Sequence, residues 1–212
     1  MKKVFLTIVI ISALSCNKVK EGAENAVNNA IENAIEKESG VQVDLPNIDN
    51  VAQNSASLMF QIGDKKILDG TEWMQGSVVF QKDEKGLTIA LTFMGDGGNS
   101  ASIQLSKVPE DFELPLEMSI AYNPQENTTD PTATVILMTV NDQTQSLPEM
   151  PFEGFFKLTK FNKDEMTFSF VGKGSNMTDV DSPSNWKEMK AEGKIFSPII
   201  MSSGIDKNKV LK

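Results

Sequence analysis

The sequence predicts an all-β domain of mainly antiparallel strands, preceded by a short helix. Residues 51–212 contain roughly ten short runs in which apolar and polar residues alternate, separated by turn-forming residues about every 8–12 positions. No helical pattern lies between these runs, and strands without crossover helices must pair mostly antiparallel. We therefore expect a single β-rich domain folded as an antiparallel β-sandwich, with a closed β-barrel as the alternative.

The predicted strands follow one another with short connections. Gly63-Asp64, residues 82–86 and residues 162–165 have the composition of tight turns, and residues 95–98 interrupt the alternation. If the sheet closes, the barrel would be calycin-like and would enclose a ligand cavity. The expected strands are residues 57–62, 65–68, 76–81, 87–93, 103–105, 116–122, 132–140, 152–161, 166–171 and 186–196, the last extendable to residue 201.

A helix is expected over residues 23–39, before the β domain. Residues 25–36 repeat a four-residue unit that places Ala, Val and Ile at a spacing of three and four, and Gly40 stands where the helix would end. We interpret residues 16–50 as a lipidated Cys, a helical stalk and an extended linker around Pro46. The alternative is that the Ala/Ile face of the helix self-associates or docks on the domain.

The N-terminus has the organisation of a secretory signal. Two Lys residues precede an apolar run over residues 4–14, which is shorter than the roughly 20 residues that span a bilayer. The ending Ala13-Leu14-Ser15-Cys16 resembles the lipobox of bacterial lipoproteins. That resemblance implies removal of residues 1–15, lipidation of Cys16 and attachment to the membrane through the lipid. Asn17-Lys18 after the Cys implies the outer membrane with the domain facing the periplasm, surface exposure being the alternative.

Composition excludes several kinds of chemistry. The chain has no His, and all 20 of its basic residues are Lys. These absences exclude Ser-His-Asp and Cys-His catalytic sites, His-ligated metals and bidentate Arg contacts. A single Cys cannot form a structural zinc site or an internal disulfide. The formal net charge of −9 argues against a nucleic-acid partner. We expect no cofactor and no metal.

Three aromatic residues are the candidate ligand contacts. Trp73, Tyr122 and Trp186 are the only aromatic residues other than Phe, and both Trp residues adjoin predicted loops. Met residues on the predicted strands are interpreted mainly as core filler and otherwise as the lining of an apolar cavity: Met59, Met94, Met118, Met138 and Met166. The acidic segment at Asp179 and Asp181 is interpreted as a solvated loop rather than a calcium site.

The last predicted strands carry a second resemblance. Residues 153–162, 166–170 and 192–196 combine Gly with alternating aromatic residues. This pattern resembles the C-terminal part of uncharacterised lipoproteins of the Bacteroidota, and it implies a β fold but no activity. The leading hypothesis is a non-enzymatic envelope lipoprotein that binds a protein partner or has a structural role. The alternatives are a binder of an apolar small ligand in a β-barrel or sandwich cavity and, less favoured, a carboxylate-based hydrolase.

Overall fold

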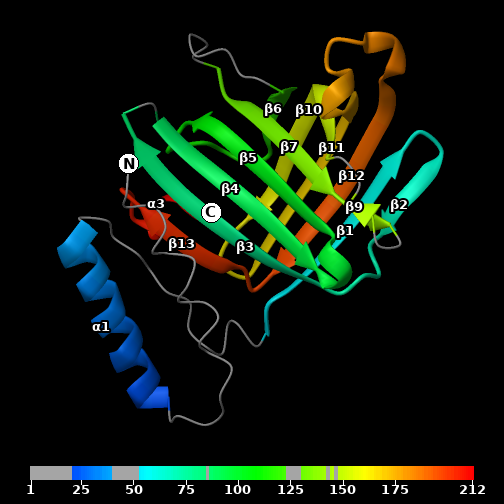
Figure 1. The fold of residues 1–212 in the computed structure, drawn as a ribbon. Coiled ribbons are helices and arrows are strands. Elements are labelled where there is room, and N and C mark those ends of the chain that lie inside the picture. Colours follow the sequence, from blue (N-terminus) through cyan, green and yellow to red (C-terminus); the bar gives the residue numbers. More distant parts are fainter. Residues whose placement is uncertain (1–20, 40–52, 85, 123–129, 142–143, 146–147) are drawn as a thin grey trace.

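The computed structural model describes residues 21–39, 53–84, 86–122, 130–141, 144–145 and 148–212. Cys16, the predicted signal segment and the predicted linker over residues 41–50 lie outside these residues. Helix α1 (Glu21–Ser39) matches the predicted helix (Figure 1). Within the described chain, no helix has the length and apolarity needed to cross a membrane. The strands are β1 (Ser55–Ile62), β2 (Lys65–Asp69), β3 (Met74–Asp83), β4 (Gly86–Gly95), β5 (Ser100–Val108), β6 (Leu116–Ala121), β7 (Thr132–Met138), β8 (Val140–Asn141), β9 (Thr144–Gln145), β10 (Glu149–Phe161), β11 (Glu165–Asn176), β12 (Lys187–Phe196) and β13 (Ile199–Ser203).

The structure confirms the all-β class, and the sheet closes into a barrel rather than forming the favoured sandwich. Nine strands form the ring in the order β3-β4-β5-β7-β6-β10-β11-β12-β1, and β1 pairs again with β3 to close it. Strand direction can alternate around a closed ring only if the strand number is even. One neighbouring pair must therefore be parallel, and it is β6–β7.

Two further strands, β2 and β13, pair with strands of the ring without being part of it. Strand β2 forms a hairpin with β1 through the predicted Gly63-Asp64 turn. The predicted extension of the last strand from residue 196 to residue 201 forms a separate strand, β13. The break occurs because Ser197 adopts a φ of 45° and Pro198 follows it. The chain changes direction there, and β13 pairs parallel with β3.

Asn54 bridges the seam where the barrel closes. Its side chain, only 6% exposed, accepts from the Gly76 amide at 3.0 Å and donates to the Gly76 carbonyl at 2.8 Å. The same Nδ2 lies 3.3 Å from the Phe196 carbonyl and 3.0 Å from that of Ser197. The Asn54 side chain therefore forms with the Gly76 backbone the two hydrogen bonds that a neighbouring strand would form. It also connects the start of β1 to β3 and to the end of β12.

Phenylalanine rings fill the barrel interior. Phe168 of β11 stacks on Phe156 of the neighbouring strand β10 at 5.4 Å between centroids and meets Phe93 of β4 edge-on at 5.6 Å. The contact with Phe93 crosses the barrel. Gly193 makes room for the ring, since a Cβ there would lie 2.3 Å from it. Opposite walls of the barrel are thus in contact through the Phe168 and Phe93 rings.

The C-terminal segment covers one end of this core. Helix α3 (Lys207–Val210) begins at Asp206, whose side chain accepts from the Asn208 amide, and Val210 is fully buried. The Lys212 amide donates to the Phe161 carbonyl at 2.8 Å, and its ammonium group lies 5.0 Å from the Phe112 ring centroid. These contacts close the end of the barrel at which β10 finishes.

We expect Asn54→Asp to destabilise the barrel by about 3 kcal/mol or more, because a carboxylate would then face three carbonyl oxygens at a buried site. Urea unfolding followed by circular dichroism measures the change. The control is Gln53→Glu, the same chemical change at the exposed preceding residue. It should change the free energy of unfolding by less than about 0.5 kcal/mol. Equal urea midpoints for the two variants would show that the seam does not depend on Asn54.

Candidate functional site

The candidate sites lie on the outside of the barrel, since rings occupy its interior. The larger depression is an open groove of about 920 Å³ where β10, β11 and β12 meet the β1–β2 turn. Phe155 and Val171 form an apolar strip along it, 67% and 57% exposed, and they are cross-strand partners. We call this depression the groove; it is lined by Gln61, Gly63, Asp64, Glu153, Gly154, Phe155, Val171, Gly172, Lys173, Lys187, Glu188, Met189 and Lys190.

A pair of glycines shapes the groove. Gly154 and Gly172 are opposite each other on β10 and β11. A Cβ on Gly154 would lie 2.3 Å from the Val171 carbonyl oxygen, and one on Gly172 would lie 2.3 Å from that of Glu153. Gly154 also has a φ of 142°, which side-chain-bearing residues rarely adopt. The two backbones can therefore approach closely beside the exposed Phe155.

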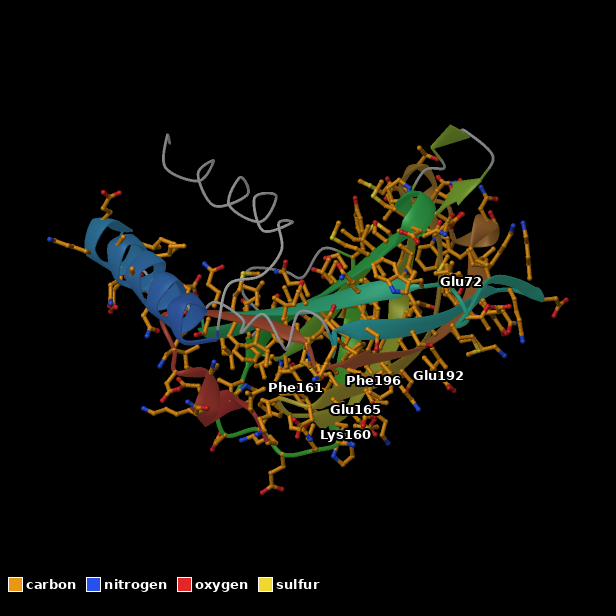
Figure 2. The ribbon with its side chains drawn as sticks, turned by 90° about the horizontal axis from the view of Figure 1, so that it is seen from below. Glu72, Lys160, Phe161, Glu165, Glu192 and Phe196 are labelled. Atoms are coloured by element: carbon orange, nitrogen blue, oxygen red, sulfur yellow. The ribbon has the colours of Figure 1, made fainter. Side chains whose placement is uncertain are left out.

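Opposite charges alternate across the strands on this side of the barrel. Lys173 is flanked by Glu153 on β10 and Glu188 on β12. Farther along, Lys157 forms an ion pair with Glu117 at 2.8 Å. Figure 2 labels Lys160, Glu165, Glu192 and Phe196 on the same face, where the Lys160 ammonium pairs with Glu165. We call the outer surface of β10, β11, β12 and β1 the charged face.

A second depression of about 380 Å³ lies farther along the charged face, beside β2. Two carboxylates line it, Asp69 and Glu192, on either side of Met59. Thr71 donates to Asp69 through its hydroxyl and its amide, and these hydrogen bonds lower the pKa of the Asp69 carboxyl below its ordinary value. A general acid at neutral pH needs the opposite shift.

The predicted aromatic contacts divide between two places. Tyr122 and Trp186 both pack against Phe152, at centroid distances of 5.4 and 5.2 Å, at the end of the barrel where β10 begins. The Trp186 indole donates to the Asp179 carbonyl at 2.9 Å, so its polar atom is used inside the protein. Trp73 is elsewhere: it directly precedes β3 beside Gly95 and is 55% exposed.

Asp179 organises the acidic loop between β11 and β12. Its carboxylate accepts hydrogen bonds from Asn185 at 2.9 Å, Ser175 at 2.8 Å and Asn176 at 3.2 Å. These hydrogen bonds hold the pKa of Asp179 below its ordinary value. In the described part of the chain, no group of three or more acidic, His or Cys side chains could hold a metal ion.

Glu149 is the half-buried carboxyl near this loop. Burial raises the pKa of Glu149, and the Asp179 carboxylate adds to the increase while Lys187 opposes it. Sequence reasoning did not single out Glu149, because only the folded chain brings β10 against the β11–β12 connection. The same is true of the groove, whose lining comes from four strands.

The barrel has a second outer surface that carries no charge. In Figure 1, β3, β4 and β5 lie in front of β10 and β11. Away from the β3–β4 turn, where Lys82, Asp83 and Lys107 lie, the outward residues of β13, β3, β4, β5 and β7 form cross-strand rows in which no side chain is charged. We call this the uncharged face; its rows are Ser203-Gln81-Thr88, Met201-Val79-Ala90-Gln104-Thr134, Ile199-Ser77-Thr92-Ser102-Ile136 and Gln75-Met94-Ser100-Met138.

The Met residues are likewise divided. Met118 and Met166 are buried in the core, as the core-filler interpretation predicted, and Met59 is half-buried on the charged face. Met94 and Met138 point outward from the uncharged face instead, because they lie on the same side of their strands as Thr92 and Ile136.

No protein-family model matches the chain, and neither a curated protein nor a solved structure is significantly similar to it. The function must therefore be argued from the residues and their arrangement.

We expect the Asp179 loop to keep its order at neutral pH and to lose it in acid. The pKa of Asp179 is lower in the folded chain than in the unfolded one. The stabilisation is thus complete above the ordinary Asp pKa of about 3.9 and disappears as pH falls through the lower folded value. Trp186 fluorescence in a Trp73→Phe background should shift to longer wavelength only below about pH 4.

Asp179→Asn should produce that fluorescence shift already at pH 7, because in either orientation its new amide nitrogen would face another amide donor, that of Asn176 or that of Asn185. Asp181→Asn, in the same loop and exposed, is the matched control and should leave the spectrum unchanged. A spectrum of Asp179→Asn identical to that of the control at pH 7 would contradict the assigned role.

Proposed function

We propose that this chain is a lipid-anchored lipoprotein of the bacterial cell envelope, attached to the outer membrane with its barrel facing the periplasm. The lipobox-like ending at Cys16, the only Cys of the chain, supports the anchor. Two or more acyl chains on one residue hold a protein on a membrane stably. Helix α1 and the residues after it would then separate the barrel from the bilayer.

We further propose that the barrel is a non-enzymatic binding module that uses the groove. The observation that supports this most is the contrast between a filled interior and an exposed apolar strip, Phe155 and Val171, inside an open depression with charged walls. Apolar anchors within a polar rim are the usual composition of a binding surface. His and Arg are absent, and hydrogen bonds from Thr71 keep the Asp69 carboxyl ionised, so the second depression offers little for acid–base catalysis.

A small apolar ligand is the second candidate occupant. The same strip favours it, since Phe155 and Val171 expose apolar surface beside the close approach of the β10 and β11 backbones at Gly154 and Gly172. Such a ligand would lie in the groove on the outside of the barrel. A protein partner would also contact the walls formed by Lys173, Lys190 and Glu188.

The anchor is tested by metabolic labelling with an alkyne fatty acid in a bacterial host that processes lipoproteins. The wild-type chain should take up label into the membrane fraction, and Cys16→Ser should take up none, because the thiol is the acceptor. Asn17→Ser, a neighbouring polar change, is the control and should label normally. Equal labelling of wild type and Cys16→Ser would overturn the anchor.

The binding module is tested by native mass spectrometry of the chain extracted from its membranes in mild detergent. Wild type should carry an adduct, and Phe155→Ser should lose at least about 90% of it, since an exposed aromatic anchor dominates such a contact. The control is Phe196→Ser, an exposed Phe on the charged face outside the groove.

The mass of the adduct separates the two candidates: a few hundred daltons indicates a small ligand and several kilodaltons a protein. An adduct that survives Phe155→Ser, or its absence from wild type, would show that the groove is not the binding site.

A further inference from the structure

We propose that the uncharged face is the interface of a two-fold symmetric dimer, so that the partner on this surface is a second copy of the chain. The proposal concerns a different surface from the groove and does not depend on the lipid anchor. The observation behind it is the separation of charge between the two outer sides of the barrel.

The composition of the uncharged face is unusual for a surface of this chain. The chain has 20 basic and 29 acidic residues. On the charged face, Lys and Glu alternate within one cross-strand row, as in Glu153, Lys173 and Glu188. On the uncharged face, four rows across five strands contain only Ser, Thr, Gln and apolar residues. Depletion of charge at the centre of a surface patch is the compositional mark of a protein–protein interface.

Charged groups border the uncharged face without entering it. At the end where β3 meets β4, Lys82 forms an ion pair with Glu110 at 2.6 Å. Asp96 follows β4 at the opposite end. An uncharged centre with a charged border is the usual layout of an interface core and rim. Burying this centre removes no ion from water, whereas burying the charged face would desolvate several.

Three large apolar side chains lie along one margin of this face. Met94 and Met138 are 63% and 39% exposed and occupy one row, separated by Ser100. Trp73, 55% exposed, precedes the Gln75 that pairs with Met94. Trp and Met are enriched at protein–protein interfaces, and Trp is frequent among the few residues that carry most of the binding energy. A position in this interface would also give a role to the exposed Trp73, which is not part of the aromatic cluster around Phe152.

Charge and area point to a second copy as the partner. A partner of opposite charge would find no side chain to pair with at the centre of this face. Two copies, each with a formal net charge of −9, repel each other. Contact through the uncharged face would keep the charged side chains of both copies at the border of the interface. Five strands about 4.8 Å apart and seven residues long give about 550 Å² per copy, or about 1,100 Å² in all. That is at the lower end for a specific dimer, so we expect a dissociation constant of about 1–100 μM.

Sedimentation velocity of the full chain in mild detergent, carrying Cys16→Ser to exclude lipidation, tests the proposal. The chain should shift from monomer to dimer as its concentration rises through the micromolar range. Thr92→Lys places an ammonium group at the centre of the uncharged face and should weaken association at least about 100-fold, since like charges would face each other across the axis. Ser169→Lys, the same kind of change at a half-buried position on the charged face, should associate as the parent does.

Cross-linking locates the interface independently. Because Cys16 is the only Cys, Thr92→Cys in the Cys16→Ser background is a single-thiol chain, and a short bismaleimide should join two copies of it. Ser169→Cys in the same background is the control and should give no cross-linked dimer under the same conditions. A parent chain that remains monomeric up to about 1 mM, ten times the upper bound of the expected constant, would overturn the proposal.

Two other results would assign the face to a different occupant and also overturn the proposal. One is cross-linking through Ser169→Cys with none through Thr92→Cys, which would place the contact on the charged face. The other is a cross-link within one chain between Thr92→Cys and Ala34→Cys, which would show that α1 covers the uncharged face.

Discussion

The closed barrel depends on the hydrogen bonds that Asn54 makes at its seam. Strands β1 and β3 share only one pair of residues, Ala56 and Met74. Beyond that pair, the Asn54 amide takes the place of a strand by binding both polar atoms of the Gly76 backbone, and it also binds the carbonyls at the end of β12. An open seam would leave these backbone groups without partners and expose the Phe core beside them. The closure that distinguishes a barrel from a sandwich thus rests on one backbone pair and one buried side-chain amide.

Closure of the barrel in turn determines which residues pack in its interior and which are available for binding on its outer surface. With nine strands around it, the interior is wide enough for the Phe168 ring to contact rings from both sides, and Gly193 leaves the space for it. The inward positions of the described strands are therefore committed to packing. Recognition has to use the outward positions, where the strands present their alternate residues.

The outward positions are not equivalent around the ring. The strands from β10 to β1 carry Lys and Glu in neighbouring rows, together with the groove and its Phe155–Val171 strip. The four outward rows on the strands from β13 to β7 carry hydroxyl, amide and apolar groups. One barrel therefore offers two chemically distinct surfaces on opposite sides. A module that binds a partner on one side and a second copy on the other fits this division.

Much of the local structure could be predicted from the sequence. The alternation of apolar residues predicted the strands and the tight turns at Gly63-Asp64 and residues 162–165, because the two-residue period of a strand and the needs of a turn are local properties. The N-terminal motif, the missing His and Arg and the position of Cys16 likewise depend on sequence alone, and they carry the proposed anchor. The uncharged rows are visible there too, as alternate residues in residues 75–81, 88–94 and 100–106.

Only the tertiary structure decided how these strands meet. Sandwich and barrel have the same alternation, and the choice between them was made by pairing across 142 residues, from Asn54 to Phe196. The groove combines β10, β11, β12 and the β1–β2 turn, and Tyr122 and Trp186 come together only through Phe152. The local sequence indicates which residues alternate along a strand. It does not indicate which strands become neighbours, because strand pairing follows from the packing of the whole core.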